Sequence, residues 1–542
     1  MVTFGGLTKA RLRAGLVAGA ALVAASATGA LAADPVDASA DPNYGSVWGG
    51  FFGRFYKAYA DEWGIVPPAD PNAVTRRPSP WPPSPESQPP FPFTEWPMGG
   101  ANYIGSTVPN SVDSPLMTAL KPTAVGQWLN GNNIQIYGWI NPGGNVSTSD
   151  GGKYGNYPAA YAYKPNTLWN DQDVVIIERL PDTVQQDHID WGFRIAGIYG
   201  ETYRYTTAQG FSSYQLQKRN NEEGYDFPMV YGELYIPGVA EGLLFRLGRY
   251  ISVPDIEAQL APNNYMYSHS MTYGYDNYTN TGLIGTLQLD RNWTAQAGVT
   301  IGTDTIPFNN NMNDPGFQPS FTGCLRYQTD SAKDAVYSCA NAWNNGQWGY
   351  NNLQQLTTTY YHKFNDQWHM SLEAWEMHQD GVAAARLPLG GVTGAGAPTD
   401  PANSNAGING AFPYFVTQPT FMQQLLGYRN GPWDAHCKPG QVECTAQEFS
   451  FLGYLNYQFS PLDNLSFRAE SFHDLNGQRT GVATVYNNAA IGWQHWFSPT
   501  ITFRPEIAYY TSGVDAFGRN NQNFDPTQDK LWVFSADLII HF

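Results

Sequence analysis

The sequence predicts an all-β protein, an up-and-down antiparallel transmembrane β-barrel of about 14 strands (12 to 16), with an N-terminal helix and a proline-rich arm. Three observations predict this class. The last twelve residues alternate between apolar and polar side chains. Beyond the N-terminal leader, no stretch of about 20 apolar residues could form a membrane-spanning helix. From residue 131 onward, strand-like segments are joined by connections that are alternately long and short.

The final segment, 531–542, reads LWVFSADLIIHF. Trp532 and Phe534 begin its apolar face and Asp537 lies on the polar face, as the two-residue period of a strand requires. A soluble sheet alternates in the same way, but aromatic residues at both ends of the apolar face are typical of a strand between lipid and water. A last strand that ends in Phe542 also resembles the assembly signal of bacterial outer-membrane barrels, which the barrel-assembly machinery recognises and which closes the barrel against strand one.

The N-terminus has the three parts of a secretory signal peptide. Basic residues precede an apolar run at 14–27, and Ala30 and Ala32 form an A-x-A cleavage site. The alternative, an anchoring helix, is disfavoured because the run is short and no stop-transfer charges follow it. We therefore expect residues 1–32 to be cleaved and the protein to be exported to a Gram-negative outer membrane.

The composition excludes several classes of function. Charged residues make up 14% of the chain against about 25% in ordinary globular proteins, and aromatic residues make up 15%. Uncharged polar residues replace charge, which suits a wet lumen and surface loops. The formal net charge of −17 excludes nucleic acid as a partner and favours cations. The sequence contains no Walker-type loop, nucleotide fingerprint or metal-ligand cluster, so we expect no cofactor and no metal.

The four cysteines form two local pairs, Cys324 with Cys339 and Cys437 with Cys444. In an exported chain each pair is expected to form a disulfide that ties one loop. A metal site is the alternative, but neither pair has CxxC spacing and no histidine cluster accompanies them.

Residues 33–130 do not have the pattern of barrel strands. Aromatic residues from Trp48 to Trp63 recur at helical spacing, so 44–63 is predicted to form one amphipathic helix. The stretch 67–97 is rich in proline, which disfavours both helix and ladder and predicts an extended arm. A periplasmic tether and a plug in the lumen remain alternatives for this arm.

Residues 131–542 are predicted to form the barrel. Long and short connections alternate along it, so both termini lie on the periplasmic side and the strand count is even. The longest connections, 303–350 and 379–446, are predicted to be extracellular loops that hold the cysteine pairs, and a hairpin hidden in 201–224 or 251–280 would change the count. The fourteen predicted strands are 132–140, 171–181, 187–200, 225–236, 242–250, 281–290, 293–302, 351–364, 367–378, 447–459, 463–473, 485–497, 500–511 and 529–542.

Several segments resemble one bacterial family. PPFPFTEW from residue 89, SPLMTAL and IQIYGWI are followed by the long run 248–282 and by RAESFHDLNGQRTG at 468–481 and RPEIAYY at 504–510. These segments are similar to the beta-barrel porin family described as OmpL-like, over most of 89–542. The resemblance implies an outer-membrane channel and no catalytic residue. The loops 303–350 and 379–446 lie outside the segments that carry the resemblance.

Strand parity predicts which charged residues face the lumen. In 463–473 and in 500–511, an Arg-x-Glu pair alternates with apolar side chains. An arginine that faces lipid near the midplane costs about 2 to 4 kcal/mol, so lumen placement is favoured. These charges either line a constriction or form ion pairs that brace the interior. The predicted lumen residues are Arg468, Glu470, Arg504, Glu506, Arg194, Arg246, Glu373 and Asp537.

Aromatic residues and histidines raise two alternatives. Tyr361, Trp375, Tyr454 and Tyr510 are also predicted to face inward, where they could stack on sugar rings or simply pack. His495 shares the outward parity of its neighbouring tryptophan, as a barrel lipase would require, but no serine and orienting acid accompany it. An interfacial histidine is the simpler interpretation, and we expect no enzyme.

The sequence thus predicts an outer-membrane porin that acts as a passive diffusion channel for small hydrophilic solutes or ions. A substrate-selective, sugar-like uptake channel and a plugged structural or adhesive barrel are the alternatives. The expected partners are outer-membrane lipid, the assembly machinery and the solutes themselves, and the aromatic outer face is compatible with a homotrimer.

Overall fold

A computed structural model gives the fold, and the chain divides into two compact units, Met1–Asp61 with Pro115–Gln135, and Glu62–Ser114 with Ile136–Phe542. The predicted signal peptide, 1–32, lies outside the described residues. The structure describes residues 49–65, 74–76, 104–106, 114–152, 155–159, 161–207, 212, 215, 221–251, 255–276, 278–303, 319–344, 354–383, 435–439, 441, 443–518 and 526–542.

The smaller unit contains three helices, α2 (Gly50–Glu62), α3 (Pro115–Leu120) and α4 (Ala124–Gly131). The helix predicted at 44–63 is present as α2 over Gly50–Glu62, and positions 44–48 of the prediction lie outside the described residues. Arg54 of α2 donates from Nε to the carbonyl oxygen of Ala119 at 3.0 Å, which fastens α2 to α3. Thr123 caps α4 by accepting the backbone N–H of Gly126 at 3.1 Å. No helix among the described residues is long and apolar enough to cross a membrane.

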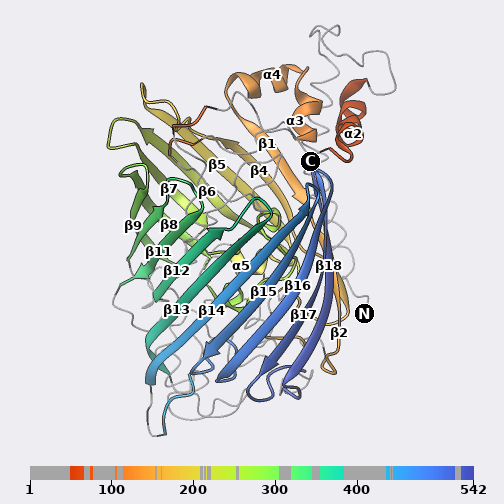
Figure 1. The fold of residues 1–542 in the computed structure, drawn as a ribbon, viewed down its shortest axis with the longest axis vertical. Helices are drawn as coiled ribbons and strands as arrows, with labels where there is room; N and C mark the ends of the chain where they lie inside the picture. The colour runs from red at the N-terminus through yellow and green to blue at the C-terminus, as the bar shows by residue number, and fades with distance from the viewer. Residues whose placement is uncertain are drawn as a thin grey trace, which may run out of the picture. The chain divides into compact units, whose positions relative to one another are not determined.

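The larger unit is a closed antiparallel β-barrel. From β4 to β18 each strand pairs with the next along the chain, and β18 also pairs with β1 and β2, which closes the ring (Figure 1). The strand segments are β1 (Gln135–Ile140), β2 (Pro142–Ser147), β3 (Thr167–Asn170), β4 (Asp173–Arg179), β5 (Asp190–Gly200), β6 (Gly224–Ile236), β7 (Leu243–Ile251), β8 (Thr279–Gln288), β9 (Trp293–Thr303), β10 (Ser320–Gln328), β11 (Asp334–Trp343), β12 (Gln354–Lys363), β13 (Trp368–Ala383), β14 (Glu443–Ser460), β15 (Asp463–Asp474), β16 (Thr484–Ser498), β17 (Ile501–Ser512) and β18 (Lys530–His541).

The first two strands of the barrel are each built from two segments. Asn141 separates β1 from β2, and Asp171 and Gln172 separate β3 from β4. The two interruptions are neighbours, because the carbonyl oxygen of Asn141 accepts the backbone N–H groups of Asp171 at 3.0 Å and Gln172 at 3.3 Å. Pro142 has no N–H with which to continue the ladder. The eighteen segments described therefore make sixteen strands, so the predicted count of fourteen is too low, while the fold class is confirmed.

The two strands that the prediction missed are β10 and β11. They lie within 303–350 and form a hairpin, so the expectation of one large loop there is wrong. The outward face of β11 includes the small or polar residues Ser338 and Ala340, whereas that of β10 carries the exposed apolar residues Phe321 and Leu325. The weak apolar signal of β11 obscures the second strand of the hairpin in the sequence.

Both predicted disulfides are present. Cys324 and Cys339 are opposite residues of β10 and β11, with Cα atoms 4.1 Å apart, so this bond joins two strands and does not tie a loop as expected. Cys437 bonds to Cys444, which lies in β14. The loop predicted at 379–446 is shorter at both ends because β13 and β14 extend into it.

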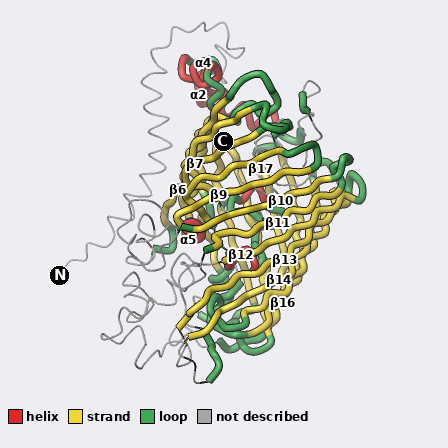
Figure 2. Tube along the Cα trace, turned by 90° about the vertical axis from the view of Figure 1, so that its left-hand side faces the viewer, coloured by secondary structure: helices red, strands yellow, loops and turns green. Residues whose placement is uncertain are grey.

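Burial alternates along the strands as the predicted parity requires. On β18, Trp532 and Phe534 are 43% and 50% exposed, whereas the intervening Val533 is 1% exposed. The apolar residues therefore cover the outside of the barrel, and alternate positions point inward. Figure 2 shows the strands running obliquely side by side around this wall.

The last strand closes the barrel against the first, as predicted. The backbone N–H of Phe542 donates to the carbonyl oxygen of Gly138 at 2.9 Å, and the reverse bond measures 3.2 Å. A Cβ atom on Gly138 would lie 2.0 Å from the carbonyl oxygen of Val174 and 2.7 Å from Cζ of Phe542. A glycine is therefore required where the two ends of the sheet meet.

Candidate functional site

The connection between β7 and β8 folds into the barrel. Its described part, 255–276, is here called the inward loop and contains the short helices η3 (Ala261–Asn263) and α7 (Met271–Tyr275). Every residue of it except Pro262 is buried. Its main partners lie on β13, β15 and β17, which are far from β7 and β8 in the strand order. The loop therefore crosses the interior from one side of the ring to the other.

Three carboxylates on the barrel wall hold the backbone of the inward loop. Glu470 of β15 accepts the N–H groups of Met271 at 2.9 Å and Thr272 at 2.6 Å, at the start of α7. Glu506 of β17 accepts the N–H of Ser268 at 2.9 Å, and Glu373 of β13 accepts that of Ile256 at 3.0 Å. Charged acceptors of this kind make the stronger hydrogen bonds of proteins, so these contacts fix the path of the loop.

Arg468 of β15 binds the middle of the inward loop. Its guanidinium donates from Nη1 to the carbonyl oxygen of Ser268 at 2.8 Å and from Nη2 to the hydroxyl of Ser268 at 2.9 Å. It also forms an ion pair with Glu257 of the loop at 3.5 Å. The side chain is thus shared between wall and loop.

Arg504 of β17 also binds both the wall and the inward loop, near η3. It donates from Nη1 to the carbonyl oxygens of Ala261 at 2.7 Å and Asn264 at 3.1 Å. On the wall it is paired with Asp537 of β18, with Nε 3.0 Å from Oδ1. Asp537 therefore acts on the loop through Arg504.

The remaining predicted residues form a separate group. Arg194 pairs with Glu178 on the neighbouring strand at 2.6 Å, and Arg246 pairs with Glu233 at 2.7 Å. The ring of Tyr231 lies between the two arginines, 4.3 Å from Arg246 and 5.9 Å from Arg194. Arg194 and Arg246 thus brace neighbouring strands of the wall, whereas Arg468 and Arg504 bind the inward loop.

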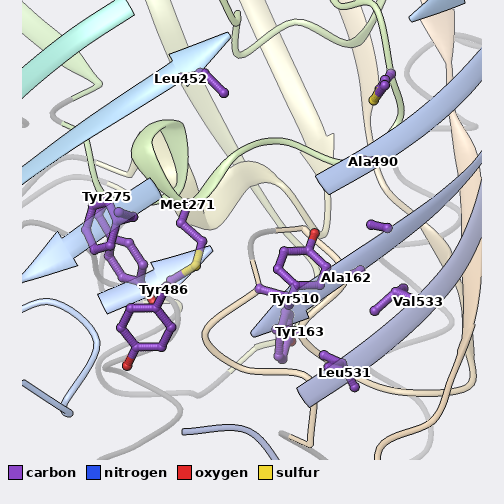
Figure 3. Close-up of a cluster of buried hydrophobic side chains, with 14 of the residues drawn as sticks. Ala162, Tyr163, Met271, Tyr275, Leu452, Tyr486, Ala490, Tyr510, Leu531 and Val533 are labelled. Atoms are coloured by element: carbon purple, nitrogen blue, oxygen red, sulfur yellow. The ribbon is translucent and has the colours of Figure 1, made fainter. Parts of the chain in front are cut away.

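Aromatic packing completes the contact between loop and wall. Figure 3 shows Met271 and Tyr275 of α7 within the buried cluster that includes Tyr486, Tyr510 and Val533 of the wall. The four aromatic residues considered as sugar platforms all face inward and are at most 3% exposed, so a sugar could reach them only after other groups moved. These are Tyr361, Trp375, Tyr454 and Tyr510.

A second aromatic cluster joins the inward loop to two other connections. Tyr161 stacks on Tyr205 with ring centres 4.6 Å apart and on His269 of the inward loop at 3.8 Å. Tyr161 and Tyr273 also donate to Oε1 of Gln259, at 3.1 Å and 3.2 Å. The inward loop is therefore held by its neighbouring loops as well as by the wall.

Two carboxyl groups lie at the ends of the inward loop, Asp255 at its start and Asp276 at its end. Burial raises the pKa of Asp255 well above its usual range, and the nearby charges of Asp276 and Glu373 raise it further. Trp375 of β13 donates from Nε1 to Asp276 at 3.4 Å. Loss of the Asp255 proton is therefore disfavoured in the folded loop.

The residues of the inward loop that contact the wall are not evident from the sequence. The sequence predicts 251–280 as an outer loop and does not single out Glu257, Ser268, Asp255 or Asp276. The available signal was composition, because seven tyrosine and methionine residues between 265 and 278 are unusual in a connection exposed to water.

His495 lies on the outside of the barrel near its turn end, as predicted. The expectation that no acid accompanies His495 is wrong, because its Nδ1 is 2.7 Å from Asp463 on the neighbouring strand, and Asp463 also accepts the indole N–H of Trp493 at 3.0 Å. The ring of Phe497 approaches His495 edge-on, with centres 4.6 Å apart. This arrangement is typical of an interfacial aromatic girdle.

Several solved outer-membrane proteins are similar to this chain at low identity. The Vibrio cholerae protein described as outer-membrane expressed OmpT is 9% identical with a TM-score of 0.40, over 76% of this chain and 97% of its own. An anion-selective porin from Comamonas acidovorans is 8% identical with a TM-score of 0.42, over 76% and 99%. The outer-membrane channel DcaP of Acinetobacter baumannii is 9% identical with a TM-score of 0.42, over 76% and 97%. A comparison with curated protein sequences gave no match.

A family model described as "Putative beta-barrel porin-2, OmpL-like" matches residues 133–542. This range begins just before β1 and ends at the last residue, so it spans the whole barrel together with its inward loop. The chain therefore belongs to the OmpL-like family of outer-membrane β-barrel porins.

Proposed function

We propose that this protein is a passive diffusion channel for small hydrophilic solutes or ions. The observation that carries the proposal is the inward loop, which crosses the barrel interior and is fastened by Glu373, Arg468, Glu470 and Arg504. A loop that is held at fixed points narrows the interior to a defined width. Solutes would be selected by size and by the charged and hydrogen-bonding groups beside that narrow zone.

In this proposal the predicted lumen charges act mainly through the loop. Arg468 is 2% exposed and Arg504 is 1% exposed, so neither presents a bare charge to passing solutes. Their hydrogen bonds determine where the loop lies, and the loop determines the bore. The chain carries out no reaction in this account.

Replacing Arg504 and Glu506 together by alanine tests the proposal. Both side chains hold the loop from β17, so their loss is expected to change single-channel conductance and ion selectivity. Lys530→Ala is the matched control, because Lys530 is exposed on β18 and makes no hydrogen bond or ion pair to the inward loop within the part of the chain that the structure describes. Conductance and selectivity that stayed at wild-type values in the double variant would show that these residues do not control the bore.

One observation favours a second candidate, a plugged structural barrel. All eight residues that were predicted to face the lumen are at most 7% exposed. If the interior is filled to this degree throughout, the folded protein would conduct nothing until the loop moves. Conductance of the unmodified protein separates the two candidates.

We further propose that Phe542 serves as the signal for the barrel-assembly machinery and that the apolar outer wall contacts outer-membrane lipid, with the short turns facing the periplasm. A homotrimer is the oligomeric state we propose to test by chemical crosslinking in native membranes. A single band at the monomer mass would exclude it.

A further inference from the structure

Two short segments of the N-terminal arm lie against the turn end of the barrel. The described residues 74–76 and 104–106 are joined to each other, because the backbone N–H of Arg76 donates to the carbonyl oxygen of Gly105 at 2.8 Å. Gly105 in turn donates to the carbonyl oxygen of Thr183, in the connection between β4 and β5, at 3.0 Å. These two segments are thus hydrogen-bonded to each other and to the barrel although they precede β1 in the sequence. The rest of the arm predicted at 67–97 lies outside the described residues.

The guanidinium of Arg76 bridges two turns of the barrel. It donates from Nη2 to the carbonyl oxygen of Thr183 at 2.6 Å and to the hydroxyl of Tyr235 at 2.7 Å. It donates from Nη1 to the carbonyl oxygen of Glu241, in the turn between β6 and β7, at 3.0 Å. The carboxylate of Glu241 lies 3.8 Å away and balances the charge. Three hydrogen-bond acceptors and one ion-pair partner therefore hold the Arg76 guanidinium at the two turns.

Ile104 supplies the apolar half of the contact. It is 1% exposed and packs in a small cluster with Tyr235 of β6 and Leu244 of β7. Tyr235 and Leu244 lie at inward-facing positions, because they are buried while the flanking Leu234 is exposed. Ile104 is therefore seated on the inner wall of the barrel and not on its lipid-facing side.

We propose that Arg76 and Ile104 form a latch that seats the segments 74–76 and 104–106 on the inner wall of the turn-end mouth, where these two segments make a second constriction in series with the inward loop. This proposal rests on the proposed channel function. The inward loop is fastened at positions within the strands, such as Glu470 and Arg468, whereas the latch lies at the turns. A solute would therefore pass two separate narrow zones, one of which belongs to the chain preceding the barrel.

Single-channel conductance of Arg76→Ala and Ile104→Ala in the full mature chain tests the constriction. Loss of the hydrogen bonds of the charged Arg76 side chain is expected to increase the undocked fraction of the segments 74–76 and 104–106 by about tenfold or more, and Ile104→Ala removes their apolar contact. The result expected is a higher conductance level, or more frequent visits to one, in both variants. Arg291→Ala is the matched control, because Arg291 pairs with Asp330 at other turns and is 58% exposed. Variants that conduct like the wild type and the control would overturn the second constriction.

Chemical crosslinking tests the docking itself without reference to conduction. Ile104→Cys combined with Leu244→Cys places two thiols in one buried cluster, and a short bifunctional maleimide is expected to join them in the folded protein. Adding Arg76→Ala to this pair is expected to lower the crosslinked fraction. Absence of crosslinking in a folded barrel would overturn the latch.

The two readouts also separate failure of the latch from failure of the proposed function. A silent wild type with a conducting Arg76→Ala variant would support the latch as a complete plug and would contradict the open channel. If wild type and variants are all silent, the second constriction is overturned together with the channel, and crosslinking reports the docking alone.

Discussion

Glu470 and Thr272 are 198 residues apart in the sequence, yet one carboxylate oxygen of Glu470 accepts both the backbone N–H of Thr272 at 2.6 Å and its hydroxyl at 2.7 Å. The other oxygen accepts the N–H of Met271. The barrel wall thus binds the first turn of α7, and the position of the inward loop depends on a side chain that faces the interior from β15.

Glu470→Ala is expected to loosen the inward loop. The variant leaves two N–H groups and one hydroxyl without their charged acceptor, and hydrogen bonds to charged groups contribute about 1.5 to 3 kcal/mol each. We expect noisier channels with a raised mean conductance. Ser471→Ala, on the opposite face of β15, is the control and should behave like the wild type. A mean conductance and a noise level in Glu470→Ala equal to those of the wild type would mean that other contacts hold the loop.

Arg468 and Glu257 are expected to be energetically coupled. Arg468→Met leaves the buried carboxylate of Glu257 without its ion-pair partner, which typically costs about 3 to 5 kcal/mol of unfolding free energy. Adding Glu257→Gln removes that uncompensated charge, so the double variant should be more stable than Arg468→Met alone. Urea-induced unfolding of the wild type, the two single variants and the double variant gives the coupling energy between Arg468 and Glu257. Losses of unfolding free energy that simply add in the double variant would contradict the coupling.

Alkaline pH is expected to release the base of the inward loop. The pKa of Asp255 is raised by burial and by the carboxylates of Asp276, Glu373 and Glu257, so the protonated form of Asp255 contributes to the stability of the folded state. This contribution is complete below the ordinary carboxyl pKa, and it is lost as pH rises through the raised pKa. Channel noise should therefore increase with pH. Asp255→Asn, which keeps a hydrogen at this position without titrating, should remove the dependence, and a pH response retained in that variant would assign it to another group.

Gly138→Ala is expected to impair closure of the barrel. The added Cβ would lie 2.0 Å from the carbonyl oxygen of Val174 and 2.7 Å from the ring of Phe542, so the ends of the sheet could not approach. Gly232→Ala is the control, because the nearest atom to its Cβ would be 3.9 Å away. The folded fraction, measured by heat-modifiable migration in detergent gels, should fall only for Gly138→Ala. Equal folding of the two variants would refute this account of closure.

The wall of the barrel was more predictable from the sequence than its contents. Inward placement of Arg468 and Arg504 follows from a local rule, since a strand has a two-residue period and lipid excludes charge. Strand β11 is not evident from the sequence because Ser338 and Ala340 weaken its outward apolar signal, and β2 is not evident because Pro142 follows Asn141 in what reads as a turn.

The inward loop could not be derived by such local rules. The partners of Ser268 lie on β15 and β17, some 200 or more residues away, and no pattern within 255–276 specifies them. The same is true of Arg76, whose acceptors belong to turns more than 100 residues downstream. Contacts of this kind depend on the closed barrel, which places residues distant in sequence around one interior.

Single-channel conductance of the purified, folded protein in a planar bilayer with a salt gradient distinguishes an open channel from a closed barrel. We expect discrete conductance steps, with a reversal potential that favours cations and is altered in the variant carrying Arg504→Ala and Glu506→Ala. Absence of conductance in a protein that is demonstrably folded would contradict the open channel and identify a barrel closed by its inward loop.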